Sequence, residues 1–309
     1  MIFWVGITDE DWFNFLAARQ PNEVNFWQPS GGQPFKAIPQ GAPFLFKLHS
    51  PKNYIVGGGF FVHNTPLPLS FAWEAFRKNN GAPDFATFAA IVRKYRDRNH
   101  IGASPDPMVG CNVLTAPFFF PESDWIPSPV DWGKSIVRGK VYDTNSDVGA
   151  DLWNRVQDWL KLRRHASVYP DRVKEPNYGS TYYSRPRIGH GAFRVLVADA
   201  YQKRCAITGE RTLPVLRAVH IRPFAQAGPH DVTNGLLLRS DLRMLFDSGY
   251  LTVTPDLDVE ISQRIKEEFG NGQEYYEMHG QKLLILPASQ IERPNKGYLE
   301  WHNHNVFVP

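Results

Sequence analysis

The sequence predicts an α+β protein with two domains, and three observations support this fold class. Short apolar runs separated by polar and Gly/Pro-rich turns fill residues 1–65, as is typical of β-strands. Several later segments have the apolar spacing of amphipathic helices. Residues 204–253 have the pattern of a strand, a polar loop, a second strand and a helix. A chain of 309 residues is long enough for two domains with their own cores.

The predicted strands of the N-terminal region are the runs IFWVGI, PFLFKL and NYIVGGGFFV. A first helix is expected after Thr8, because a threonine that precedes acidic residues is a common helix start. Further helices are expected at 70–79, 84–96, 149–165 and 190–203. Residues 102–150 are rich in Pro, Gly, Asp and Trp, so we expect irregular structure there. The Gly57–Gly59 run lacks the spacing of a dinucleotide-binding loop and predicts a bulge or a close approach of strands.

A segment without periodicity separates the two predicted domains. Residues 166–186 carry Pro, Gly, Ser and Tyr in no regular spacing, and we expect them to form a linker. The N-terminal domain would then span residues 1–165 and the C-terminal domain residues 187–309.

The composition indicates a soluble globular protein, with 42% hydrophobic and 21% charged residues. No stretch approaches the roughly 18 apolar residues of a membrane helix, and the first residues lack the features of a secretory signal. We therefore expect a cytoplasmic protein without a membrane partner. The two cysteines, Cys111 and Cys205, are far apart and in no CxxC pair, so neither a disulfide framework nor a cysteine zinc site is expected.

The positive charge is concentrated in one region of the chain. The net charge is +3, but residues 185–250 alone hold ten Arg and Lys against five Asp and Glu. This local excess favours a polyanionic partner such as nucleic acid, although an ordinary solvated surface can carry a similar excess.

The chemistry-bearing stretch of the C-terminal domain is residues 204–253. His220 ends the first predicted strand, Asn234 begins the second, and a helix starts at Ser240, which is expected to cap it. This arrangement resembles the HNH endonuclease family, whose ββα-metal unit has a His after the first strand, an Asn at the second, and a His or Asn in the helix. The resemblance implies a nuclease in which His220 is the general base and Asn234 holds the loop that orients it. The helix residue would bind a divalent ion, Mg²⁺ or Mn²⁺.

The helix position departs from the family pattern, because Arg243 stands where a histidine is usual. Arginine stays protonated and offers no lone pair to a cation. Three explanations remain open at this point. The metal would be held by other groups, such as Asp247 or His230; Arg243 would itself contact the phosphate; or the chain would be impaired in cleavage. His230 would otherwise be a solvated loop residue, and Asp247 would simply end the helix.

Further residues of the C-terminal domain are candidates for contacts with DNA. Arg217, Arg222 and Arg239 would bind phosphates, although each would equally serve as a surface charge. His302 and His304 alternate in the segment 299–307, for which we expect a strand-like surface tail rather than a metal pair.

The N-terminal region resembles, more loosely, the PUA-like β-barrels, which include EVE, ASCH and SRA-type readers of modified bases. The residues that carry this resemblance are FWVGITDEDWFNFL at 3–16, VNFWQPSG at 24–31 and FLFKLHSPKNYIVGGGFFV at 44–62. The resemblance implies an N-terminal PUA-like β-barrel with flanking helices, in which an extruded base lies between aromatic rings and its edge is read by polar groups.

The candidate base-recognition residues fall into a stacking group and an edge-reading group. Trp12, Phe26 and Trp27 would stack, whereas Asn25, Gln28 and His49 would read the edge of the base. Because Phe, Trp and Tyr make up 14% of the chain, most aromatic rings must form the core. Trp27 is the expected exception, since its Gln/Pro/Ser/Gly setting predicts an exposed loop.

Together these features predict a modification-dependent DNA restriction endonuclease. The N-terminal domain would recognise modified double-stranded DNA, the C-terminal domain would cut it with a divalent ion, and the resemblance favours a homodimer. Two alternatives are a non-cleaving protein that binds modified DNA through a degenerate HNH site, and an HNH nuclease effector without modification dependence.

Overall fold

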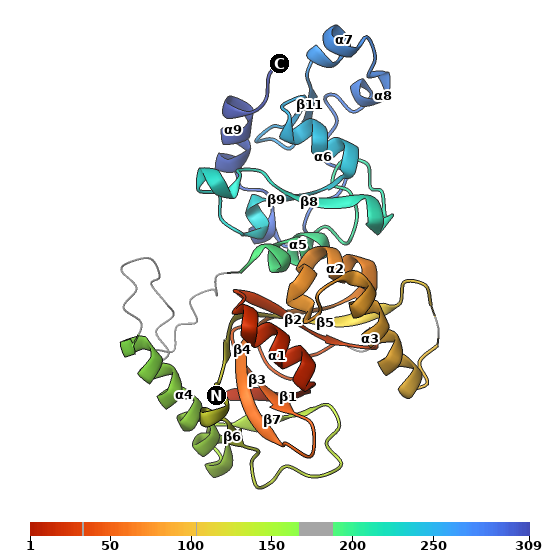
Figure 1. Ribbon diagram of the computed structural model, residues 1–309. Helices are drawn as coiled ribbons and strands as arrows, with labels where there is room; N and C mark the ends of the chain where they lie inside the picture. Colours follow the sequence, from red (N-terminus) through yellow and green to blue (C-terminus); the bar gives the residue numbers. More distant parts are fainter. Residues whose placement is uncertain (33, 103, 167–187) are drawn as a thin grey trace. The chain divides into compact units, whose positions relative to one another are not determined.

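The structure, a computed structural model, describes residues 1–32, 34–102, 104–166 and 188–309 (Figure 1). It is a mixed α+β protein in which the chain divides into two compact units, Met1–Arg187 and Ile188–Pro309. Apart from Ala166, the predicted linker at 166–186 lies outside the described residues. No helix in the described ranges is long and apolar enough to cross a membrane.

The N-terminal unit is built on one mixed sheet with strand order β2-β5-β4-β3-β1-β7, and β6 pairs with β4. β1 and β3 are parallel, and the other pairings are antiparallel. Among the described residues, the two end strands β2 and β7 do not pair with each other. The sheet is therefore open there and does not form a closed, hydrogen-bonded barrel. The strands are β1 (Ile2–Thr8), β2 (Glu23–Gln28), β3 (Pro43–Leu48), β4 (Tyr54–Pro68), β5 (Met108–Phe119), β6 (Ile126–Pro127) and β7 (Gly139–Asp143).

The expectation of irregular structure at 102–150 was wrong, because this region contains three strands. β5 is twelve residues long and lies between β2 and β4. Most of its side chains are buried on both faces of the sheet, so the strand lacks the alternation of apolar and polar residues that identifies a half-exposed strand.

Four α-helices accompany the sheet, and their positions match the predicted segments closely. The first begins one residue later than expected, because Thr8 is still the last residue of β1 and Asp9 takes the N-cap position. The third is capped by Asp84, whose carboxylate accepts a hydrogen bond from the Thr87 amide at 2.8 Å. The helices are α1 (Glu10–Arg19), α2 (Leu69–Phe76, followed by the 3₁₀ turn Arg77–Asn80), α3 (Phe85–Arg98) and α4 (Asp147–Ala166).

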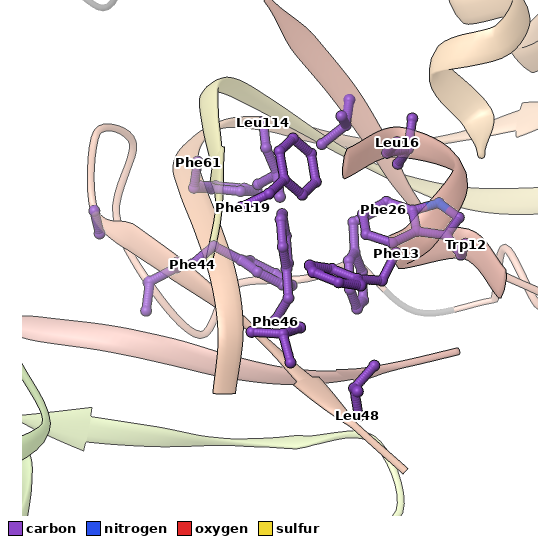
Figure 2. Packing of buried hydrophobic residues seen from close by; sticks show 14 residues of the cluster. Trp12, Phe13, Leu16, Phe26, Phe44, Phe46, Leu48, Phe61, Leu114 and Phe119 are labelled. Atoms are coloured by element: carbon purple, nitrogen blue, oxygen red, sulfur yellow. The ribbon is translucent and has the colours of Figure 1, made fainter. Parts of the chain in front are cut away.

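Two apolar clusters among the described residues pack on the sheet of this unit. In one, α1 packs on Phe44, Phe46 and Leu48 of β3, together with aromatic residues of β2, β4 and β5 (Figure 2). In the other, α4 packs on Phe3, Val5 and Leu45. Because alternate residues of β3 belong to different clusters, both faces of the strand are buried.

The C-terminal unit contains the predicted strand–strand–helix order as β8 (Leu216–His220), β9 (Gly235–Arg239) and α6 (Ser240–Asp247). β8 and β9 form an antiparallel pair in which His220 lies opposite Gly235. α5 (His190–Ala200) packs against this pair. The unit also contains β10 (Leu251–Val253), β11 (Val259–Ile261), α7 (Arg264–Phe269), α8 (Gln273–Tyr276) and α9 (Lys296–Asn305).

The expected strand-like surface tail at 299–307 is instead helical up to Asn305, where α9 ends. Asn295 caps this helix by accepting a hydrogen bond from the Gly297 amide at 2.8 Å. His302 is 2% exposed and stacks on Phe246 of α6 with 3.7 Å between ring centroids. Both of its ring nitrogens are hydrogen-bonded, to Thr252 and to the Phe246 carbonyl. His302 therefore joins α9 to α6 and has no ring nitrogen left for a metal.

At Gly57, β4 approaches β5 closely, as expected for the Gly57–Gly59 run. A Cβ atom at this position would lie 2.3 Å from the carbonyl oxygen of Phe118 in β5. We expect Gly57→Ala to lower the free energy of unfolding by about 1–3 kcal/mol, because the strands must separate to admit the methyl group. The measurement is urea unfolding followed by tryptophan fluorescence, since every tryptophan except Trp301 lies in this unit.

Gly32→Ala is the matched control, because a Cβ atom there would have no neighbour within 4 Å. We expect it to change stability by less than about 0.5 kcal/mol. Equal effects of the two substitutions would contradict the role of close approach at Gly57.

Candidate functional site

Three imidazole rings meet at the end of the β8–β9 pair. His220 ends β8, His190 begins α5, and His230 lies in the loop between the two strands. Nε2 of His220 and Nδ1 of His230 are 2.9 Å apart and share a hydrogen bond. The ring centroid of His190 is 5.7 Å from each of the other two. The structure thus brings together two residues predicted from sequence and one, His190, that was missed.

Packing against α5 fixes the His220 ring. The imidazole stacks on Phe193 with 3.8 Å between centroids and 10° between planes. Gly235, opposite His220, permits this contact, because a Cβ atom there would lie 2.4 Å from Cγ2 of Val197 in α5. The absence of a side chain at Gly235 therefore allows α5 to pack closely on β9.

The surroundings of His220 favour its neutral form. Burial lowers the pKa of His220 to about 4, and the charges of His230, His190, Arg194 and Arg243 act in the same direction. The pKa of His190 is lowered mainly by burial and then by Arg194, and that of His230 by burial. Uncharged imidazoles with available lone pairs therefore dominate this cluster at neutral pH.

Asn234 is fully buried and holds the loop after His220 closed. Its Oδ1 accepts a hydrogen bond from the Arg222 amide at 2.9 Å. Its Nδ2 donates to the carbonyl oxygens of Arg222 at 2.9 Å and Pro229 at 3.0 Å. The Asn234 main-chain carbonyl accepts from Ile221 at 2.9 Å. One side chain thus ties both ends of the loop that contains His230, directly beside the base candidate.

Helix α6 carries an ion pair at the position expected to bind metal. Nε of Arg243 lies 3.1 Å from Oδ2 of Asp247, one turn later. Burial raises the pKa of Asp247, and Arg243 opposes that shift. Ser240 does not cap this helix as expected, because its hydroxyl donates to the Val215 carbonyl at 2.8 Å and Arg239 takes the N-cap position.

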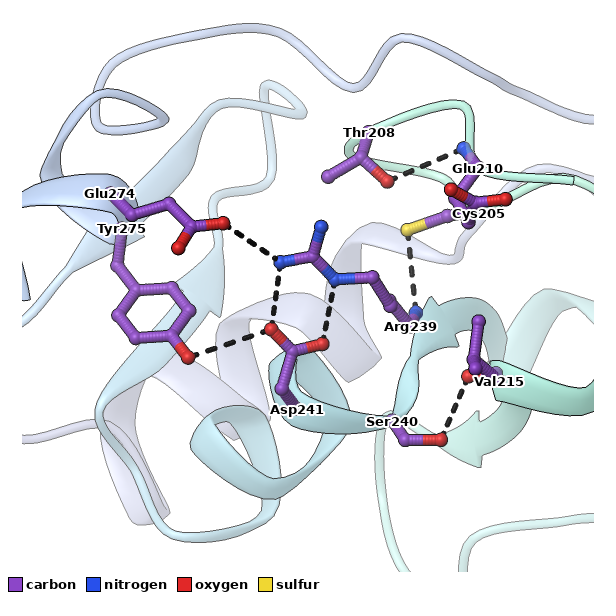
Figure 3. A network of polar contacts seen from close by, with 9 residues as sticks. All are labelled: Cys205, Thr208, Glu210, Val215, Arg239, Ser240, Asp241, Glu274 and Tyr275. Atoms are coloured by element: carbon purple, nitrogen blue, oxygen red, sulfur yellow. Dashed lines mark hydrogen bonds and ion pairs between the residues drawn. The ribbon is translucent and has the colours of Figure 1, made fainter. Parts of the chain in front are cut away.

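The three arginines predicted to bind phosphate all have contacts within the protein. Arg239 forms a bidentate pair with Asp241, with both N–O distances at 2.7 Å, and lies 3.5 Å from Glu274 (Figure 3). Arg222 donates to the Gln226 carbonyl at 2.6 Å and lies over the Trp301 ring. Arg217 donates to the carbonyl oxygens of Pro214 and Leu216. The carboxylates around Arg239 already satisfy much of its guanidinium.

The donor atoms at this site do not fit a divalent ion. HNH nucleases generally use a divalent metal, and oxygen-rich ligand sets suit Mg²⁺ and Mn²⁺. Throughout the described ranges no group of three His, Cys, Asp or Glu side chains is arranged to hold a metal ion. His220 and His230 are hydrogen-bonded to each other, and Asp247 is paired with Arg243. We therefore derive no chemical step through a metal at this site.

A pocket of about 550 Å³ opens in the N-terminal unit, and five predicted base-recognition residues line it. They are Trp12, Phe26, Trp27, Gln28 and His49. The pocket lies where the end of β1, the start of α1, the end of β2 and α3 meet. Its size and mixed aromatic and polar lining suit a planar organic ligand.

Trp27 is not in an exposed loop as expected. It lies in β2, is partly buried, and its indole N–H donates to the Asn80 carbonyl at 3.0 Å. Trp12 and Phe26 are 6% exposed and form part of the core (Figure 2). Asn25 does not line the pocket; it is fully buried and its Nδ2 donates to Asn80. The rings of Trp12 and Phe26 therefore belong to the core and also form part of the pocket wall.

The polar side of the pocket was not predicted from the sequence. The Tyr95 hydroxyl donates to Oδ1 of Asp9 at 2.5 Å, and the same oxygen lies 3.5 Å from Nε2 of His49. Burial and the Asp9 contact raise the pKa of Tyr95, which keeps the hydroxyl a donor. Asp9 stands at the N-cap of α1 without capping it by its side chain. Arg138 also lines the pocket. These four residues are far apart in the sequence, and their proximity becomes apparent only in the folded structure.

Comparison with known proteins supports the nuclease resemblance. Residues 205–254, which contain β8, β9 and α6, match the HNH endonuclease family. The resemblance seen in the sequence is therefore confirmed for this segment. Among proteins of curated function, no relative matches the chain.

Solved structures offer distant similarities. A variant of the ASCH protein of Zymomonas mobilis is 7% identical and covers 52% of this chain and 97% of its own, with a TM-score of 0.30. The modification-dependent restriction endonuclease TagI is 13% identical over 92% of this chain and 75% of its own, with a TM-score of 0.27. The type IV phosphorothioation-dependent restriction endonuclease ScoMcrA is 12% identical over 78% and 46%, with a TM-score of 0.19. TM-scores of this size do not define a shared fold.

Asn234→Asp tests the closure of the loop by a nearly isosteric change. An aspartate would still accept from the Arg222 amide but would face two carbonyl oxygens without a proton to donate. We expect the free energy of unfolding to fall by about 3 kcal/mol, because a buried charge loses its partners. Thermal unfolding of the C-terminal unit, followed by calorimetry, measures the effect.

The control is Asn271→Asp, which makes the same change at an exposed position. A loss of stability no larger than that of the control would show that Asn234 does not hold the loop.

Proposed function

We propose that this chain, whose residues 205–254 match the HNH endonuclease family, is an endonuclease that hydrolyses DNA phosphodiester bonds and acts on modified double-stranded DNA. The observation that carries this proposal is the placement of a neutral, half-buried His220 beside the loop that Asn234 closes.

His220 serves as the general base. Its Nε2 bonds His230, and no hydrogen bond to its Nδ1 occurs within the described residues, so Nδ1 is available for water. In the tautomer that donates from Nε2 to His230, the Nδ1 lone pair accepts one proton of the attacking water. The water oxygen bonds to phosphorus while the bond to the leaving oxygen breaks, and the leaving oxygen takes a proton from solvent. His230 and Phe193 hold the ring in place.

The N-terminal pocket provides the recognition element of the proposal. We assign to this unit the role of a PUA-like reader of an extruded modified base, with Trp27 stacking on the base and Gln28 and His49 reading its edge. Base–aromatic stacking contributes about 1–3 kcal/mol for each base, and the pocket volume of about 550 Å³ accommodates a nucleobase. Cleavage by a homodimer would allow each site to cut one strand.

Two other functions compete with this proposal. The Arg243–Asp247 pair favours a protein that binds modified DNA without cutting it. A nuclease effector without modification dependence would cut modified and unmodified DNA equally. Plasmid cleavage on both substrates, with Mg²⁺, with Mn²⁺ and with EDTA, separates the three functions.

His220→Ala tests the assigned base. We expect the substitution to lower the cleavage rate by at least about 100-fold, because a positioned base contributes roughly 10²–10⁴-fold. Binding to the same DNA should stay within about twofold, as measured by fluorescence anisotropy. His304→Ala is the control, since His304 is exposed on α9 and, among the described residues, its side chain bonds the Glu300 carbonyl alone. Cleavage retained by His220→Ala would reject His220 as the base.

Trp27→Ala tests the recognition pocket. The variant loses one wall of the pocket, so we expect the preference for modified over unmodified duplex to fall by about tenfold, in line with the stacking contribution. Trp73→Ala removes a ring of the same size from α2, in the same unit and outside the pocket lining. Binding constants for both duplexes, measured on variants of verified fold, decide the case. An unchanged preference would remove Trp27 from the recognition site.

A further inference from the structure

We propose that the helix position that binds a divalent ion in HNH nucleases is, in this chain, a site for the phosphodiester itself, bound by the guanidinium of Arg243. The site would take an anion in place of a cation. This inference rests on the proposed function to the extent that DNA is the ligand, and it assigns to Arg243 the contact with the scissile phosphate.

The carboxylates of α6 are already neutralised by arginines. Asp247 pairs with Arg243 at 3.1 Å. Asp241 pairs with Arg239 at 2.7 Å, as Figure 3 shows. A hard divalent ion needs oxygen ligands that are free to approach it at about 2.0–2.6 Å. A cation at this helix would have to displace a guanidinium from one of these carboxylates.

The geometry of Arg243 suits an anion. Its side chain is 40% exposed, and its Nε–H is directed to Asp247, which fixes the plane of the guanidinium. No hydrogen bond of its terminal amino groups falls within the described parts of the chain. These two groups have the fork geometry that binds two oxygens of a phosphate.

The charges around the histidines also favour an anion over a cation at this site. The positive charges of Arg194 and Arg243 both reach His220 and His190, where each lowers the pKa of the imidazole. Because the three imidazoles are then largely uncharged at neutral pH, the guanidinium of Arg243 remains as a fixed positive charge that acts on His220 and His190. A positive charge at this position repels a divalent cation, whereas it attracts the negative charge of a phosphodiester.

Two readouts on the full chain test the anion site without relying on cleavage. The first is binding of an unmodified 12-base-pair duplex in EDTA at several salt concentrations. Removal of one phosphate contact lowers the slope of log K against log[salt] by about 1, so we expect this loss and about tenfold weaker binding in Arg243→Ala. Arg243→Lys keeps the charge and should keep the slope.

Arg264→Ala is the matched control for the salt dependence. Arg264 is also paired with a carboxylate one turn later, Glu268, but on α7. We expect the control to leave the slope unchanged. Equal slopes for the wild type and Arg243→Ala would overturn the proposal.

The second readout is Mn²⁺ binding followed by electron paramagnetic resonance. The wild type should bind no Mn²⁺ that depends on His220, so the wild type and His220→Ala should give the same titration. Arg243→His restores the residue type usual in the family, and we expect it to gain Mn²⁺ binding that a second change, His220→Ala, abolishes. Mn²⁺ binding by the wild type that is lost in His220→Ala would overturn the proposal.

Cleavage then separates this inference from the proposed function. If the wild type shows the Arg243-dependent slope and cuts DNA in EDTA, both stand. If the salt dependence of DNA binding by the wild type depends on Arg243 but the wild type cuts DNA under no condition, the endonuclease proposal fails and the anion site stands. If it cuts only with Mn²⁺ bound at His220, the endonuclease stands and the anion site fails.

Discussion

The closed loop between β8 and β9 is the constraint on which the catalytic arrangement depends, and the amide of Asn234 provides it. The buried amide of Asn234 satisfies backbone N–H and C=O groups on both sides of this loop with one side chain. The hydrogen bonds place His230 within 2.9 Å of His220. Without this closure, His230 would lose the loop conformation that brings it to His220, whose own ring is fixed by Phe193.

Much of the fold was predictable because its signals are local. The helices at 84–96 and 149–165 were found from apolar spacing, and the strand–strand–helix order at 204–253 from motif and spacing. β5 was missed because burial on both faces removes the alternation that reveals a strand. The segment 299–307 was misjudged for a related reason: one buried face of a short helix, anchored by His302, gives too few residues to define a period.

In the candidate site, too, residues with a local sequence signal were predicted and residues without one were missed. His220 and Asn234 belong to one short motif, and the resemblance of that motif to the HNH family was enough to predict that they act together. His190 was missed because it approaches His220 only through the packing of α5 on the strands. The Asp9–Tyr95 pair spans 86 positions and has no local signature. Arg243 was identified as unusual from the sequence, yet its pairing with a carboxylate one turn later emerges only from the structure.

β4 gives the N-terminal unit a property that neither core would have alone. Its residues Val56 and Phe61 pack in the cluster under α1, whereas Ile55 and Phe60 pack in the cluster under α4. One continuous strand therefore contributes to both clusters, so the separation of either layer from the sheet would expose apolar side chains of that strand. The shared strand couples the stability of the two clusters to each other.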